Sequence, residues 1–297
     1  MKISILSPVY NEEQHLPEMM DSLRAQSHTN WEVCFVDDGS TDGTADLIRA
    51  AAERDPRIRL VGHGRKFGKA AAFNHAFAAS TGEGIVLLAG DDRIPPDSLA
   101  IRAADLSSCE PGERGLAGYK LRSFSEDPQF DGMELPRGDA TSASGGVLTF
   151  TRELAEIVFP IPEELPSEDI WLGQAGPALA GRYIKHPVVV LEYRIHPGNS
   201  NPRGQDFAAM SRSIGARHEA WRLLLEQERF TLPPQVRVHL RAMYAAEQAR
   251  RRGDLIGVLR QPGLTSAERG SLAAMTAAPL WSVRQRFYKA LSGRQGR

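Results

Sequence analysis

The chain has 297 residues, of which 41% are hydrophobic and 25% charged, and its formal net charge at pH 7 is -1. This composition is that of a soluble globular protein, and two cysteines are too few for a disulfide framework. Residues 1–203 hold 20 Lys and Arg against 30 Asp and Glu, whereas residues 204–297 hold 16 against 7. We therefore expect the two parts to face different partners.

A few features of the same sequence predict the cellular compartment of the protein. The low cysteine content favours a reducing environment. The first apolar run, residues 3–6, is stopped by Pro8 and the acidic Glu12 and Glu13, so we expect no secretory signal there. No apolar segment approaches the length needed to span a membrane. These features predict a cytoplasmic protein.

Apolar runs and helical patterns alternate over the first hundred residues. The predicted strands cover residues 2–9, 31–36, 57–61 and 85–89, and the predicted helices cover 12–26, 44 to about 54, and 69–79. Such alternation predicts an α/β fold with a parallel sheet and right-handed crossovers. The carboxyl ends of parallel strands lie at one edge of the sheet, where open α/β sheets bind their ligands.

The fourth strand ends at two adjacent carboxylates, Asp91 and Asp92. They repel each other and are costly to desolvate, so a buried strand that ends with them needs compensating positive charge. A hard divalent cation supplies it. The alternative is that both residues begin a turn ahead of Pro95 and Pro96.

The first two strands also end in loops with suitable chemistry. Pro8 fixes a bend, Tyr10 can pack against a planar base, and Asp38 can accept hydrogen bonds from a base or a ribose hydroxyl. Residues 38–42 equally suit a turn and a helix cap, in which case Ser40, Thr41 and Asp42 are structural.

The glycines after the third strand match no standard phosphate loop. Gly62, Gly64 and Gly68 are spaced one residue too widely for the dinucleotide fingerprint, and a phosphate loop that ends at Lys69 would need glycine at His63. The nearby Lys66, Lys69 and Asn74 could meet a phosphate or a sugar, or they form a solvated basic face beside a flexible turn.

Four motifs, in order and spacing, resemble the large inverting family-2 glycosyltransferases with the GT-A fold, over about residues 1–203. They are residues 8–13, 36–44, 68–74 and 88–92. The resemblance implies a Rossmann-like, mostly parallel central sheet flanked by helices, followed here by a basic helical extension over residues 204–297.

The resemblance also implies a donor site and a metal site. The implied donor-nucleotide contacts are Pro8, Tyr10, Glu12, Asp38, Lys69, Asn74 and Asp91. The family's acidic motif reads Asp-x-Asp-Asp, and Ala89 occupies its first position. Asp91 and Asp92 are therefore implied to bind ribose and the diphosphate-bridging Mg²⁺ or Mn²⁺ without that first acid. His196 is implied at the metal, and Arg194 at the diphosphate.

The segment expected to bind the acceptor sugar comes after Asp92 in the chain. A helix over 96–108, a strand over 116–124 and a polar loop over 125–139 precede a small-residue segment that resembles the family's acceptor region. That segment places Gly145 and Gly146 beside the acceptor sugar, although a tight turn explains them equally well. The loop over 125–139 is either a mobile lid or variable surface.

A second pair of acids follows at Glu168 and Asp169. Ser167 can cap a helix there, and acids in its first turn suit the helix dipole, which is a purely structural explanation. The resemblance implies that Asp169 is the catalytic base, with Glu168 as the weaker candidate. Trp171 either forms a platform for the acceptor sugar or fills the core.

The final segment predicts amphipathic helices around Trp221 and Leu240 and a basic terminus. Residues 281–297 carry five Lys and Arg and no acid, interleaved with Phe287, Tyr288 and Leu291. Such a segment suits an anionic membrane surface, which would make the protein peripheral at the inner membrane face. The alternative is a solvated tail.

Together these features predict inverting, metal-dependent transfer of a hexosyl or hexosaminyl group from a nucleotide diphosphate sugar, with a UDP-sugar as first choice. The predicted acceptor is a hydroxyl of a glycan or lipid-linked molecule in cell-surface polysaccharide synthesis, and no nucleic-acid partner is expected. One alternative is a sugar nucleotidyltransferase, which would need a Gly-rich basic loop where residues 8–11 stand. The other is a non-catalytic sugar- or nucleotide-binding module, which Ala89 favours.

Overall fold

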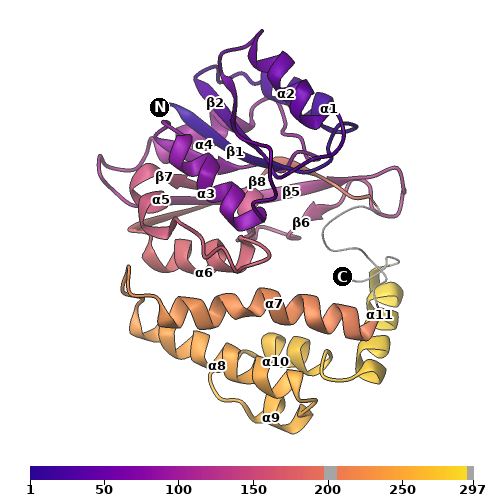
Figure 1. Cartoon of the computed structure of the whole chain (residues 1–297). Coiled ribbons are helices and arrows are strands. Elements are labelled where there is room, and N and C mark those ends of the chain that lie inside the picture. Colours follow the sequence, from indigo (N-terminus) through magenta and orange to yellow (C-terminus); the bar gives the residue numbers. More distant parts are fainter. Residues whose placement is uncertain (197–205, 293–297) are drawn as a thin grey trace. The chain divides into compact units, whose positions relative to one another are not determined.

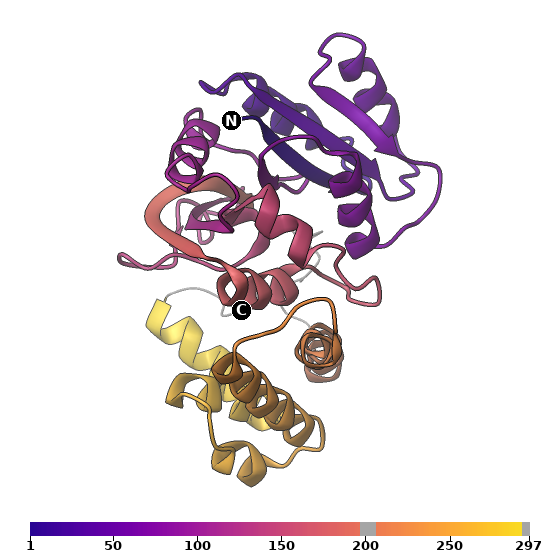
Figure 2. The ribbon, with the colours of Figure 1, turned by 90° about the vertical axis from the view of Figure 1, so that its left-hand side faces the viewer.

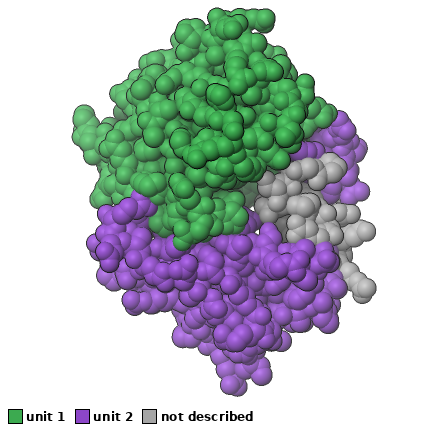
Figure 3. Space-filling view, viewed as in Figure 1, with its two compact units in different colours: residues 1–124, 132–194 green, residues 125–131, 195–297 purple. Residues whose placement is uncertain are grey.

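The computed structural model describes the backbone of residues 1–196 and 206–292, and side chains as far as residue 285. The described chain divides into two compact units (Figure 3). Unit 1 comprises residues 1–124 and 132–194, and unit 2 comprises residues 125–131 and 195–297. The boundary predicted at 203/204 lies outside the described residues.

Unit 1 is built on one eight-stranded sheet with the order β3-β2-β1-β4-β7-β5-β6, and β8 pairs with β5. The first four strands are parallel: β1 (Ile3–Val9), β2 (Trp31–Asp37), β3 (Ile58–Gly62) and β4 (Gly84–Leu87). The later strands are β5 (Gly115–Phe124), β6 (Glu134–Leu135), β7 (Leu148–Thr151) and β8 (Arg182–Arg194). β7 runs antiparallel to β4 and β5, β6 is antiparallel to β5, and β8 is parallel to β5.

Helices surround this sheet in Figure 1. They are α1 (Leu16–Arg24), α2 (Thr44–Ala52), α3 (Lys69–Ala79), α4 (Ser98–Leu106), α5 (Arg152–Val158) and α6 (Asp169–Leu179), with a single 3₁₀ turn, η1, at Gly145–Val147. α3 packs on β1, β2 and β3, and α4 packs on β5, β7 and β8. Because helices cover the sheet, every residue of β2 is buried, as expected for a central parallel strand. The predicted α/β class is confirmed.

The first helix begins later than the predicted residue 12. Asn11 adopts a left-handed backbone with φ 54°, which breaks the helical path. The backbone N–H of Glu12 donates to Thr44 Oγ1 (2.8 Å), and Gly43 N–H donates to Glu13 Oε2 (3.0 Å). These residues therefore join two loops, and α1 starts at Leu16 with proline in its first turn.

Unit 2 is helical, as predicted for the extension, and its helices pack side by side in both views (Figures 1 and 2). They are α7 (Phe207–Glu226), α8 (Pro234–Arg251), α9 (Leu255–Arg260), α10 (Ser266–Ala273) and α11 (Ala278–Ser292). Their apolar core includes Met210, Ala246, Val258, Leu272 and Trp281. No helix in the described part of the chain is both long and apolar enough to cross a bilayer.

Candidate functional site

The loops after β1 and β2 hold each other at the carboxyl edge of the sheet. Asp38 N–H donates to the Val9 carbonyl (2.8 Å), and Asn11 N–H donates to Ser40 Oγ (2.9 Å). Thr41 N–H in turn donates to Asn11 Oδ1 (2.9 Å). Ser40 and Thr41 are thus structural contacts between the two motifs, which was one of the two interpretations open from the sequence.

Tyr10 and Asp38 lie near each other through Lys66. The Lys66 ammonium is 3.3 Å from the centre of the Tyr10 ring and 3.0 Å from Asp38 Oδ2. Asp38 Oδ1 accepts the backbone N–H groups of Phe67 and Gly68, which fixes the start of α3. Tyr10 is 48% exposed, with the Lys66 ammonium over one face of its ring. Pro8 lies beside it in β1, in register with Val36.

Asp91 and Asp92 follow β4 in a crowded acidic region. Asp92 is 5% exposed, and its Oδ1 accepts the N–H of Arg194 (2.9 Å), whose Nε donates to the Asp91 carbonyl (2.8 Å). Burial, and then the charge of Asp91, raise the pKa of Asp92 well above its usual value. Burial, Asp91 and Asp42 likewise raise the pKa of Glu12 to about 8. Several carboxyl groups are therefore crowded together here, and their charged forms are disfavoured without a compensating cation.

This donor set suits a hard divalent cation. Two adjacent carboxylates can ligate such an ion, and its charge would relieve the repulsion that raises the pKa of Asp92. Among the described residues, no group of three or more His, Cys, Asp or Glu side chains could hold a metal by itself. A cation at Asp91 and Asp92 would thus take its other ligands from a diphosphate and water, as Mg²⁺ commonly does.

Beside this pair, Arg194 lies in a cluster with Arg93 and Glu18, and the sequence predicted only Arg194 at the site. The guanidinium groups of Arg93 and Arg194 lie 4.2 and 4.3 Å from the centre of the Phe124 ring. Both arginines pair with Glu18, and Arg93 also pairs with Glu192. Arg93 directly follows Asp92, which was a usable signal. Glu18 lies 176 residues from Arg194 in the chain and gave no local signal.

The second acid pair lies at the start of α6. Glu168 is 5% exposed, and its Oε2 is 3.1 Å from Lys69 Nζ at the start of α3. The carboxylate of Asp169, the first residue of α6, accepts the N–H of Gly145 (3.3 Å). A Cβ on Gly145 would lie 3.2 Å from Glu168 Oε1, so this glycine permits close packing against both acids. Gly146 similarly packs against Leu191.

Two side chains predicted at the site make contacts within the fold. The Asn74 amide donates to the Ile161 carbonyl (2.8 Å) and accepts the Ile161 N–H (2.7 Å), so it anchors the chain before α6, and its contact with a donor nucleotide stays a prediction. Trp171 is 0% exposed, and its Nε1–H donates to the Val158 carbonyl (2.8 Å). A fully buried indole offers no face to an acceptor sugar, so Trp171 belongs to the core.

Two further predictions concern residues toward the end of the chain. His196 belongs to unit 2, so its predicted place at the metal stays a prediction. Arg284 donates to the Ser271 carbonyl (3.1 Å) and to Ser271 Oγ (3.2 Å). The remaining basic and aromatic side chains of the proposed membrane segment, from residue 286 onward, lie outside the described part.

The fold is that of known sugar transferases. The structure of TarS from S. aureus, in complex with UDP-GlcNAc, aligns with a TM-score of 0.62 over 100% of this chain and 93% of that chain, at 18% identity. The mannosyltransferase PcManGT from Pyrobaculum calidifontis, in complex with GDP-Man and Mn²⁺, gives a TM-score of 0.60 over 98% and 84%, at 21% identity. These likenesses define a GT-A fold.

The amino-terminal third of the chain is similar in sequence to known glycosyltransferases. Residues 4–107 match the model for glycosyl transferase family 2. TuaG of Bacillus subtilis, a putative teichuronic acid biosynthesis glycosyltransferase, is 35% identical over 97 residues, which are 33% of this chain and 38% of that protein. Over residues 4–107 the chain is therefore similar to glycosyl transferase family 2. It spans between 11 and 38% of the length of such curated relatives.

Proposed function

We propose that this chain transfers a sugar from a nucleotide diphosphate sugar to a hydroxyl of a glycan or lipid-linked acceptor, with inversion at the anomeric carbon. The observation that carries the proposal is the placement of Lys69. Its ammonium contacts Glu168, and although burial lowers its pKa, the charges of Glu168, Asp169 and Asp91 raise it. This charge between the acid pair of α6 and Asp91 supports a donor site beside a catalytic base.

The donor half of the proposed site consists of Pro8, Tyr10, Glu12, Asp38 and the Asp91–Asp92 pair. The exposed Tyr10 ring can stack on a base, and the carboxylate of Asp38 lies on the same side of Lys66. A UDP-sugar is the first choice, which the UDP-GlcNAc complex of TarS supports, and GDP-mannose in PcManGT is the second. The transferred group would be hexosyl or hexosaminyl.

Asp91 and Asp92 would hold Mg²⁺ or Mn²⁺, and the Mn²⁺ in the PcManGT complex supports this. When bound, such an ion stabilises the negative charge of a leaving diphosphate. Arg194, whose guanidinium contacts the Asp91 carbonyl and Glu18, is proposed to contact the diphosphate. His196 is proposed as a further metal ligand.

Asp169 would act as the general base. Its carboxylate is held by the Gly145 N–H at the start of α6, beside the small-residue segment at which Gly145 and Gly146 would admit an acceptor. As the acceptor hydroxyl attacks the anomeric carbon from the face opposite the diphosphate, Asp169 takes its proton. The diphosphate leaves without protonation, so one carboxylate base is enough, unlike the two that glycoside hydrolysis requires.

Cell-surface polysaccharide synthesis is the proposed setting, supported by the teichuronic acid assignment of TuaG. We place the protein in the cytoplasm, peripherally at the inner membrane face. The excess of basic residues after residue 203 supports this placement, because anionic lipids attract such segments.

Calorimetric titration of UDP, GDP, ADP, CDP and dTDP, each with and without Mn²⁺, tests the donor site. We expect one nucleotide to bind with Mn²⁺ and to bind at least about tenfold more weakly to Asp91→Asn, because a metal-ligating charge is lost. Asp46→Asn, on an exposed carboxylate of α2 (86% exposed), is the matched control and should bind normally. Binding of no nucleotide under any condition would contradict the donor site.

A further inference from the structure

Lys69 occupies a position that helix energetics disfavour. It is the first residue of α3, after Gly68 with φ 88°, and the first turn of this helix contains no acid. The amino end of a helix carries partial positive charge, so a lysine there is repelled by the dipole. Helix stability therefore does not explain this residue, and its ammonium needs a compensating partner.

That partner is Glu168. Lys69 Nζ lies 3.1 Å from Glu168 Oε2, and the exposed fractions of the two side chains are 37% and 6%. Burial would lower the pKa of Lys69, but Glu168, Asp169 and Asp91 together raise it above its usual value. Burial raises the pKa of Glu168 above its usual value. The charge of Lys69 opposes this rise, and the charge of Asp169 adds to it. The buried carboxylate thus depends on this ammonium for its charge.

The backbone around both residues is fixed. Gly68 N–H donates to Asp38 Oδ1 (2.8 Å), which places the start of α3 against the loop after β2. On the other side, Gly145 lies against Glu168 and donates its N–H to Asp169. The first turn of α6 is therefore held between Lys69 and Gly145, and a shift of either contact would move Asp169.

We propose that Lys69 is a positioning residue for Asp169, acting through its ion pair with Glu168, and that it is not a contact of the donor nucleotide. The sequence motif alone placed Lys69 in the donor site, and the geometry places its ammonium on the acid pair of α6. This inference rests on the proposed function for its catalytic consequence, but the ion pair itself does not.

Steady-state kinetics and nucleotide titration of the full chain separate the two roles. In Lys69→Met we expect kcat to fall about 10²-fold, the loss typical of a small misplacement of a catalytic group. The dissociation constant of the nucleoside diphosphate should stay within about twofold of wild type, since the nucleotide contacts are intact. Lys69→Arg, which keeps the charge, should retain most of kcat. Lys185→Met, on an exposed lysine of β8, is the control.

Rescue is the result that distinguishes positioning from general loss of structure. Glu168→Gln in the Lys69→Met background removes the unpaired buried charge, so the double variant should recover part of the lost kcat. Additive losses in the double variant would overturn the proposal. So would a tenfold weaker nucleotide affinity in Lys69→Met with unchanged kcat, which would return Lys69 to the donor site.

Urea unfolding of wild type, Lys69→Met, Glu168→Gln and the double variant tests the ion pair without any activity. We expect the shifts of the unfolding midpoint for Lys69→Met and Glu168→Gln to be non-additive, because each single variant leaves the other residue unpaired. Additive shifts would overturn the proposal. If wild type turns over no donor yet the shifts are non-additive, the proposed function fails and the pair stands. Lys69→Gln replaces Lys69→Met if the latter does not fold.

Discussion

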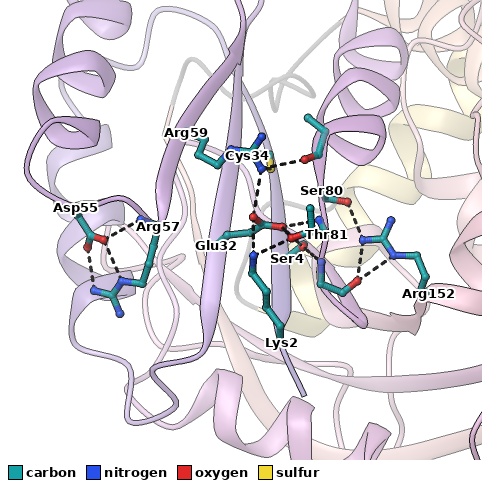
Figure 4. Close-up of polar contacts among 12 residues, drawn as sticks. Lys2, Ser4, Glu32, Cys34, Asp55, Arg57, Arg59, Ser80, Thr81 and Arg152 are labelled. Atoms are coloured by element: carbon teal, nitrogen blue, oxygen red, sulfur yellow. Dashed lines mark hydrogen bonds and ion pairs between the residues drawn. The ribbon is translucent and has the colours of Figure 1, made fainter.

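Glu32 is a buried charged residue near the start of β2, next to the apolar residues 33–36. Its carboxylate accepts hydrogen bonds from Lys2 Nζ (2.9 Å), Ser4 Oγ (2.7 Å) and Thr81 N–H (2.6 Å), and Arg59 lies 3.2 Å away (Figure 4). Burial opposes ionisation, but the hydrogen bonds from Lys2, Ser4 and Thr81 lower the pKa of Glu32 from 4.5 to about 2. The side chain joins β1, β2 and the turn before β4.

Glu32→Gln should lower the free energy of unfolding at pH 7 by about 3 kcal/mol. This value follows because folding lowers the pKa of Glu32 from 4.5 to about 2, and each pKa unit corresponds to roughly 1.4 kcal/mol. A carboxyl whose folded pKa is depressed stabilises the protein above its unfolded pKa, and this stability is lost as pH falls. In urea titrations, the difference between wild type and variant should therefore shrink from pH 4.5 to pH 2. A difference independent of pH would contradict this account.

At the element scale, Asn74 on α3 holds the chain between α5 and α6 through two hydrogen bonds to Ile161. Asn74→Ala should lower the free energy of unfolding by about 2 kcal/mol, about one for each bond lost, with nucleotide affinity unchanged. Urea unfolding and nucleotide titration measure the two effects. Asn30→Ala, at an exposed asparagine, is the control. Weaker nucleotide binding with normal stability would restore the donor role that the sequence indicated.

Asn74 also shows where prediction from sequence ends. The bounds of α3, Lys69–Ala79, follow from the preceding Gly68 and the Ser80-Thr81-Gly82 turn, because helix ends are set by local chemistry. The partner of Asn74 is 87 residues away, and no local pattern shows such a pairing. Trp171 is similar, since a residue beside the acid pair of α6 has the same neighbours in sequence whether it faces the core or a ligand.

The motifs at strand ends were predictable, because the topology of a parallel sheet decides which of them lie together. Parallel strands bring their carboxyl ends together, so the order of β1, β2 and β4 in the chain was enough to place Tyr10, Asp38 and Asp91 at one edge. The short strand β7 joins the sheet antiparallel to β4 and β5, and its four residues carry no pattern that reveals direction. Glu18 lies on α1 and pairs with Arg93 and Arg194, which are far from it in sequence, so its place beside Asp91 and Asp92 depends on the tertiary fold.

At the scale of the whole molecule, unit 2 depends on a buried ion cluster. Glu247 is 0% exposed and accepts hydrogen bonds from Arg250 Nε (2.7 Å) and Arg251 Nε (2.9 Å), and His218 Nδ1 lies 2.8 Å away. Burial opposes ionisation, but the bonds from Arg250 and His218 lower the pKa of Glu247 to about 2. This cluster joins α7 to α8.

Glu247→Leu should therefore destabilise the protein by about 3–5 kcal/mol, because the fully buried Arg250 guanidinium loses its carboxylate. Thermal unfolding followed by circular dichroism measures the change. Glu228→Leu, at an exposed glutamate between α7 and α8, is the control and should leave the midpoint nearly unchanged. Equal midpoints for both variants would show that the cluster does not stabilise unit 2.

We propose sugar transfer with Asp169 as the base. The most direct measurement is release of nucleoside diphosphate from UDP-sugars and GDP-mannose by wild type and Asp169→Asn, with Mn²⁺ and a hydroxyl acceptor present. We expect release by wild type, a loss of about 10²- to 10⁴-fold in the variant, and nucleotide binding within about twofold of wild type. Equal release by the two proteins would contradict the role of Asp169, and release from no donor would contradict the transferase itself.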